Sequence, residues 1–341
     1  MVVNKHQVLL NILNNQPTDI TLASFWHHFL ADEKQQVLGY QDLKSIAEVV
    51  RLQQEFYDNA QPGFTKIMSD NFFLTPSLLG KKFNNITELA QIKPISADDP
   101  WITRQVKAIK DIVEHYHGEI GSFYNIFSPW YQVRLRFEIL DNDPKKIYSF
   151  FKESPEKFKE VLTILAQDLK LLVKKLITES GIDGIYLCVQ QPQDDAITLD
   201  QWRKYIKPSE LELLKDAQKY SDNNILHICG FEGKKNHLND YQDYPFKAVN
   251  WATYVEHVSL KEGKELFNGR AILGGFDNTT HGVFYKGTQA EIEAETKRLL
   301  ADNGSQGLLI GADCSIPFNT IDDRIKWVSV ATASKNQLYG Q

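Results

Sequence analysis

The chain has 341 residues, of which 42% are hydrophobic and 24% are charged, and its formal net charge is −6. This composition is typical of a globular protein and excludes a disordered or fibrous chain. A negative net charge without a dense run of Lys and Arg offers no field that attracts phosphate backbones, so nucleic acid is not an expected partner. No uncharged apolar run approaches the roughly 18 residues that a membrane span needs, so no membrane partner is expected either.

The N-terminal segment 1–18 has the pattern of a short amphipathic helix, and it carries no cleavage site typical of a leader. We therefore expect a cytoplasmic protein whose N-terminal helix packs on the main domain. The three cysteines are too few, and odd in number, for a disulfide framework. In a reducing compartment they are core residues, metal ligands or reactive thiols.

Short apolar runs alternate along the chain with amphipathic segments of helical length, which is the pattern of a parallel sheet covered by helices. Eight such runs are predicted to be strands: 21–26, 64–68, 119–124, 183–189, 224–229, 246–251, 270–276 and 306–312. Eight strand and helix units favour a closed (β/α)8 barrel of the TIM type over an open doubly wound sheet. Because no linker or repeat divides the chain, residues 1–341 are predicted to form one domain with an N-terminal helical extension.

Helix starts between these strands are marked by residues that cap the first turn. Hydroxyl side chains that accept from backbone N–H groups, followed by Pro at the first position or by Glu or Gln three residues later, are typical of helix N-termini. The sequence has Ser154 before Pro155, Thr198 with Gln201, and Thr288 with Glu291.

Polar residues follow most of the predicted strands directly. The active sites of such barrels lie at the C-terminal ends of the strands, so these side chains are expected to converge on one mouth. They are His27, His28, Asp70, Asn125, Gln190, Gln191, His227, Cys229, Asn250, Asp277, Asp313 and Cys314.

The pair His227 and Cys229 has a spacing that places both side chains on one face of a strand. If that face is the interior, Cys314 after the last strand completes a set of one imidazole and two thiolates. This combination favours zinc, and three protein ligands leave one position open, as in catalytic zinc sites. The alternative is that Cys229 is an ordinary core cysteine beside a satisfied histidine, because Cys is among the most buried residue types. Cys188, inside the run DGIYLCV, is interpreted as a core residue.

The motif His227-Ile228-Cys229 followed by Cys314 carries a resemblance to a known family. The chain resembles the uroporphyrinogen decarboxylase superfamily, and within it the zinc-dependent, corrinoid-linked methyltransferase branch. Segments in the family's order run along nearly the whole chain: MSDNFF (68–73), GEIGSFYNIF (118–127), ESGIDGIYL (179–187), NGRAILGGFDN (268–278) and GLLIGADCSIP (307–317).

The resemblance implies a mechanism in which zinc, held by the His-x-Cys and Cys residues, binds the thiol of a small substrate and lowers its pKa. The resulting thiolate then attacks a methyl group. Asp70 matches the catalytic aspartate of the decarboxylases, although it is also placed to orient His28 or a substrate. Substrate-positioning roles are expected for His27, His28, Gln190 and Asp277, whose alternative roles are those of ordinary loop caps and turn residues.

Two departures from the family pattern bear on function. No arginine precedes Arg51, whereas the decarboxylases open with an Arg-rich segment that clamps the carboxylates of the tetrapyrrole. The chain also has no Asp-x-His-x-x-Gly motif for a corrinoid, which would therefore arrive on a separate protein. Two alternatives stay open: a uroporphyrinogen decarboxylase, and a barrel that binds a metal or a small ligand without turnover.

Overall fold

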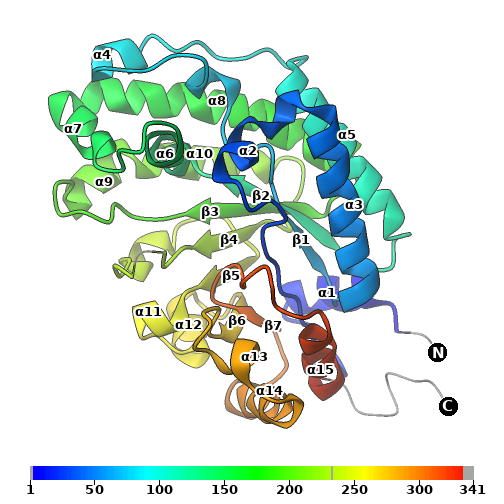
Figure 1. Ribbon diagram of the computed structural model, residues 1–341. Coiled ribbons are helices and arrows are strands. Elements are labelled where there is room, and N and C mark those ends of the chain that lie inside the picture. Colours follow the sequence, from blue (N-terminus) through cyan, green and yellow to red (C-terminus); the bar gives the residue numbers. More distant parts are fainter. Residues whose placement is uncertain (1–2, 232, 333–341) are drawn as a thin grey trace.

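The computed structural model describes residues 3–231 and 233–332 and contains a curled sheet of seven parallel strands (Figure 1). The strands follow one another in chain order, so every crossover joins neighbours. Their bounds are β1 Thr65–Ile67, β2 Ser122–Phe127, β3 Gly184–Val189, β4 Ile225–Ile228, β5 Ala248–Trp251, β6 Ala271–Phe276 and β7 Leu308–Ala312. The predicted α/β architecture with a parallel sheet is thus confirmed, and it resembles a TIM-type barrel.

The prediction of a strand at 21–26 is wrong. Ala23 makes only an isolated parallel bridge with Ile310 of β7, and on its other side its carbonyl accepts from Gly63, which precedes β1. The ladder does not continue, because the carbonyl of Trp26 accepts from Ile316 in the loop beyond β7 and not from a strand. Gly63 permits this close approach, since a Cβ there would lie 2.8 Å from the Cβ of Leu22. The segment therefore lies between β7 and the start of β1 as a bridging loop, and the described sheet has seven strands instead of eight.

Helices cover the outer face of the sheet. Figure 1 shows the long helices α3, α5 and α8 beside the strands at one end of the sheet and the later helices, α11 to α15, around β5 to β7. The helices are α1 Lys5–Leu13, α2 Glu33–Leu38, α3 Leu43–Ala60, α4 Ile86–Leu89, α5 Pro100–His115, α6 Pro129–Leu135, α7 Lys146–Glu153, α8 Pro155–Glu179, α9 Leu199–Tyr205, α10 Lys207–Ala217, α11 Thr253–Glu256, α12 Leu260–Leu266, α13 Val283–Lys286, α14 Gln289–Asn303 and α15 Asp323–Thr332. Short 3₁₀ turns are η1 Gly39–Gln41, η2 Pro76–Leu78 and η4 Leu238–Tyr241, and η3 Arg136–Leu140 is a π-helical turn.

The predicted helix caps form as expected. Thr198 and Thr288 each take part in a full capping box, and the Ser154 side chain accepts from the N–H of Lys157 ahead of Pro155. A third capping box, Ser259 with Glu262 at the start of α12, follows the same rule but was not predicted.

The predicted N-terminal helix is present as α1, and it covers the N-terminal ends of the strands. Lys5 donates to carbonyls just before β1, His6 lies 2.6 Å from Asp183 before β3, and Leu9 packs with the apolar side chains of the sheet interior. One end of the interior is therefore closed by apolar packing, which leaves the opposite end, where the strands finish, as the place for polar chemistry. Within the described residues, no helix combines the length and the low charge that crossing a bilayer requires.

Candidate metal centre

The side chains of His227, Cys229 and Cys314 meet at the C-terminal ends of β4 and β7. Their ligand atoms all lie within 4.8 Å of one another, and Cys314 Sγ is 3.6 Å from His227 Nε2. A sulfur at about 2.3 Å and a nitrogen at about 2.0 Å from one tetrahedral ion are about 3.6 Å apart, so this spacing suits a zinc-sized ion. His227 and Cys229 are buried, whereas Cys314 is partly exposed and gives access to the group.

Backbone geometry explains how the three residues converge. Strand alternation turns His227 to the interior with Ile225, and Cys229 continues the same face just past β4. Gly230 lets the chain turn away at once, because a Cβ there would lie 2.3 Å from the Cβ of Ala252. After β7, the Asp313 carboxylate accepts from the Thr253 hydroxyl at 2.8 Å and from a backbone N–H at 2.9 Å, which anchors the bend that carries Cys314.

Asn250 of β5 determines which nitrogen of His227 faces the sulfurs. Its Nδ2 donates to the carbonyls of Leu273 and Ala312, at 2.9 and 3.2 Å, so its Oδ1 must be an acceptor. That oxygen accepts from the Tyr186 hydroxyl at 2.9 Å and lies 2.5 Å from His227 Nδ1, which must therefore carry its proton. Nε2 then faces Cys314, as in histidines whose second nitrogen is held by a neighbouring acceptor so that the first can bind a metal.

Tyr131 supplies a contact to one of the sulfurs. Ser128 caps α6 directly after β2, and this position brings the Tyr131 hydroxyl to 3.6 Å from Cys229 Sγ, to which it donates. An O–H donor withdraws negative charge from a thiolate and so stabilises it. Neither this contact nor that of Asn250 was predicted from the sequence, although Asn250 was recognised as one of the polar residues that follow the strands.

Electrostatics inside the group favour a bound cation. Burial lowers the pKa of His227, but the Cys314 and Cys229 sulfurs outweigh it and raise that pKa to about 9. The hydrogen bond with Cys229, together with burial, raises the pKa of the Cys314 thiol to about 12. Without a cation the group thus retains protons between its ligand atoms, and a divalent ion would replace those protons.

Cys188 lies outside this group, as predicted. It pairs with His227 across β3 and β4 and is buried, but it does not belong to the set of ligand atoms within 4.8 Å. The two cysteines of the candidate ligand group, Cys229 and Cys314, are therefore the two that were predicted as ligands from their position at the end of an apolar run.

Asp70 and the two neighbouring histidines lie on the β1 side and are not among the metal-ligand group. The buried Asp70 carboxylate accepts from the N–H groups of Phe29 and Leu30, both at 3.3 Å, and lies 3.4 Å from His28 Nδ1. His27 Nδ1 is 2.9 Å from the carbonyl of His28, and burial lowers the pKa of His27. These contacts hold the loop 27–30 in place, while the catalytic role of Asp70 and the substrate-binding roles of His27 and His28 stay predictions.

Gln190 and Asp277 also follow strands, as predicted, and both are engaged by neighbouring groups. Gln190 accepts from Arg134 and donates to the carbonyl of Phe231 at 2.6 Å, next to the loop of Cys229. Asp277 accepts from the N–H of Thr279 at 2.8 Å, which is a local turn contact. Their substrate-binding roles stay predictions.

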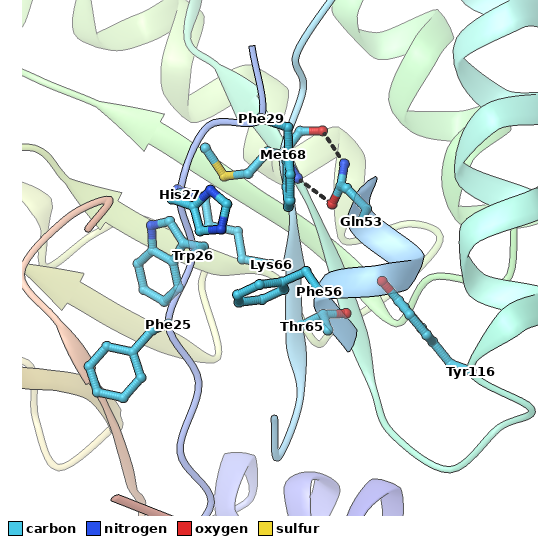
Figure 2. A pocket seen from close by; sticks show the side chains of 10 residues that line it. All are labelled: Phe25, Trp26, His27, Phe29, Gln53, Phe56, Thr65, Lys66, Met68 and Tyr116. Atoms are coloured by element: carbon cyan, nitrogen blue, oxygen red, sulfur yellow. Dashed lines mark hydrogen bonds between the residues drawn. The ribbon is translucent and has the colours of Figure 1, made fainter. Parts of the chain in front are cut away.

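A small pocket beside β1 contains one unexpected charge. Figure 2 shows the side chain of Lys66 running from β1 toward the segment that carries Trp26 and His27. The rest of the lining is mostly aromatic, and none of the three candidate ligands contributes to it. A lysine between Thr65 and Ile67 in a buried strand was the signal in the sequence that something other than packing is present.

The fold and the order of these features define the class of protein. The chain belongs to the uroporphyrinogen decarboxylase (URO-D) family, whose model matches residues 75–334. Among curated proteins it is similar to the methylcobamide:CoM methyltransferase MtbA of Methanosarcina mazei, with 24% identity over 282 residues, which is 83% of this chain and 77% of the relative. The resemblance to the corrinoid-linked methyltransferase branch of the superfamily is thereby confirmed.

Among solved structures, the chain is similar to a B12-independent methionine synthase from Shewanella sp. W3-18-1 in complex with selenomethionine. The TM-score is 0.55 at 12% identity, and the match covers 92% of this chain and 95% of that chain. At this identity the likeness concerns the fold alone.

Proposed function

We propose that the protein is a zinc-dependent methyl or alkyl transferase that activates a small thiol as the acceptor. The observation that carries the proposal is the set of one imidazole and two sulfurs, whose ligand atoms lie within 4.8 Å of one another with the histidine Nε2 turned to Cys314 Sγ. Three such ligands leave a fourth position for a substrate. The family and the similarity to a methylcobamide:CoM methyltransferase support group transfer as the reaction.

In this proposal His227, Cys229 and Cys314 hold the zinc, Asn250 fixes the imidazole, and Tyr131 donates to Cys229 Sγ. When bound, zinc lowers the pKa of a thiol in its open position and makes a thiolate available at neutral pH. The methyl donor is a corrinoid on a separate protein, since the sequence has no corrinoid motif. Asp70, His27, His28, Gln190 and Asp277 are proposed to position the substrate, and the protein is proposed to act in the cytoplasm.

The test begins with elemental analysis of untagged protein prepared without added metal, which should contain about one zinc per chain. Turnover is then measured with free methylcobalamin as donor and a panel of small thiols as acceptors. Protein that stays metal-free after incubation with zinc contradicts the proposal. Zinc without methyl transfer to any thiol, even with corrinoid proteins added, would favour a metal-binding barrel without turnover.

The decarboxylase alternative has its own test. The loops before β1 contain no arginine, since the first in the chain is Arg51. We therefore expect no conversion of uroporphyrinogen to coproporphyrinogen, followed by chromatography of the porphyrins. Enzyme-like formation of coproporphyrinogen would replace the methyltransferase proposal.

A further inference from the structure

Lys66 places an amino group in the buried interior of the sheet. Its neighbours Phe64 and Met68 belong to the interior apolar cluster, and strand alternation places Lys66 on the same face. The residue is only 5% exposed. Its ammonium lies over two aromatic rings, 4.9 Å from the ring centre of Trp26 and 4.2 Å from that of Tyr186.

No anion neutralises this ammonium within the described parts of the chain, 3–231 and 233–332. Among the described residues, the contacts of Lys66 Nζ are those with the two aromatic rings, and no carboxylate oxygen there lies within 4.0 Å of it. Buried lysines are rare unless they are paired, because an uncompensated charge in a low-dielectric interior is costly. Contacts with two ring faces offset only part of that cost.

Three cysteine thiols act on the Lys66 amino group, and two of them belong to the candidate metal centre. Burial lowers the pKa of Lys66, and the opposing influences come from Cys188, Cys314 and Cys229. A short chain of contacts also joins the two places, because Tyr186, whose ring receives the ammonium, donates to Asn250, which in turn holds His227. Lys66 is thus one aromatic ring away from the metal-ligand histidine.

The net charge of the candidate centre indicates what a nearby amino group could do. A zinc ion with two cysteine thiolates and a neutral imidazole has no net charge, and a substrate thiolate in the fourth position brings the centre to −1. We propose that Lys66 is the counter-cation of the thiolate-loaded centre, a positioning residue that favours binding of the substrate as the anion. This inference rests on the proposed function and deepens it, since it names a residue outside the ligand set that compensates the negative charge of the bound thiolate.

The test compares Lys66→Met with wild type as zinc or cobalt(II) protein. Met has a similar length and no charge. With 2-mercaptoethanol as the probe, thiolate binding is followed by calorimetry and by the sulfur-to-cobalt charge-transfer absorption. We expect binding of the probe to weaken by about ten-fold or more, since one attractive charge in a low-dielectric interior is lost. Metal content should stay at the wild-type level, because the centre without the thiolate is neutral.

Stability of the metal-free protein supplies a readout that a structural role would not produce. Removal of an unpaired buried charge should keep or raise the melting temperature of Lys66→Met. Lys66→Arg, which restores the charge, should recover part of the affinity for the probe. Met68→Leu, an uncharged change on the same face of the same segment, is the matched control and should leave the affinity unchanged.

The outcomes separate this inference from the proposed function. Wild-type protein that binds no metal contradicts the proposed function, and the role of Lys66 falls with it. Wild-type protein that binds metal and thiol while Lys66→Met binds the thiol equally well refutes the counter-cation role and leaves the proposed function standing. A marked fall in the melting temperature of Lys66→Met, without a selective loss of thiol binding, would make Lys66 a structural residue.

Discussion

Polar residues gather in two places at the C-terminal end of the sheet, one beside β1 and one beside β4 and β7. The two places differ in whether the polar side chains already have hydrogen-bond partners. On the β1 side, the Asp70 carboxylate is already engaged by the N–H groups of Phe29 and Leu30. On the side of β4 and β7, His227 Nε2 and the two sulfurs have mainly one another as partners. Buried polar groups are normally satisfied, so a cluster whose best missing partner is a cation is the better candidate for a ligand site.

Substitutions in the two regions are therefore expected to affect different properties of the protein. Changes on the β4 and β7 side should affect metal and thiol binding with limited effect on folding. Changes at Asp70, which holds the loop 27–30 on the β1 side, should affect folding and leave the metal in place.

The largest effect is expected for the sulfur ligands. Cys229→Ser and Cys314→Ser should each lower zinc affinity by roughly a thousand-fold or more, because a hydroxyl is a far poorer zinc ligand than a thiolate. Competition with a chromophoric chelator measures the affinity. Cys188→Ser is the matched control and should keep zinc, with some loss of stability from a polar atom in the core. Loss of zinc in Cys188→Ser with retention in Cys314→Ser would show that the wrong cysteine has been assigned.

The next effect concerns the residue that holds the histidine. Asn250→Leu removes the acceptor that fixes the Nδ1 proton of His227, and loss of such a partner typically costs 10- to 100-fold in metal affinity, roughly what we expect here. The carbonyls of Leu273 and Ala312 also lose their donor, so the free energy of unfolding should fall. Chemical denaturation in the presence of a chelator separates the two effects. Unchanged zinc affinity would mean that the imidazole orientation does not depend on Asn250.

The contrast between Asn250 and the ligands also shows what the sequence can predict. His227, Cys229 and Cys314 could be predicted as candidate ligands because they lie at the ends of apolar runs, and in a parallel sheet all such positions share one end. The partners of a side chain cannot be predicted in this way. Asn250 and Tyr131 come from strand β5 and helix α6, and only the curl of the sheet decides that both reach the same imidazole and sulfur.

For the fold, too, the strands could be predicted from the sequence but not all of their pairing partners. Seven of the predicted strands form, because each is a buried apolar run between turn and capping residues, although β2 is Ser122–Phe127 where 119–124 was predicted. The run at 21–26 is equally apolar, but its hydrogen-bond partners beyond Ile310 lie in loops, and pairing of this kind is set by tertiary contacts and not by composition. The burial of Lys66 could not be predicted for a related reason, since one charged residue in a strand is usually solvated and only the tertiary structure places this one in the interior.

For Asp70 on the β1 side, the backbone contacts predict a smaller effect, on stability and not on zinc content. Asp70→Ala leaves two buried N–H groups without an acceptor, which should lower the free energy of unfolding by about 1–3 kcal/mol. Zinc content should be unchanged. Asp70→Asn keeps an acceptor oxygen and should lose less stability. The catalytic role implied by the family resemblance makes the opposite prediction for Asp70→Asn, namely normal stability and zinc with turnover abolished, and measurements of all three quantities distinguish the two roles.

The smallest effect is expected for the hydroxyl that contacts Cys229. Tyr131→Phe removes an O–H donor 3.6 Å from Cys229 Sγ, and because sulfur is a weak acceptor the zinc affinity should fall only a few-fold. The ring still stacks on Phe127, so the free energy of unfolding should change little. Tyr244→Phe is the matched control: it removes a buried hydroxyl that donates to Glu210 at 2.7 Å, away from the ligand group, and should cost stability while leaving zinc affinity unchanged. If both variants bound zinc like wild type, the Tyr131 hydroxyl would have no part in holding the metal, and the centre would depend on its three ligands and Asn250 alone.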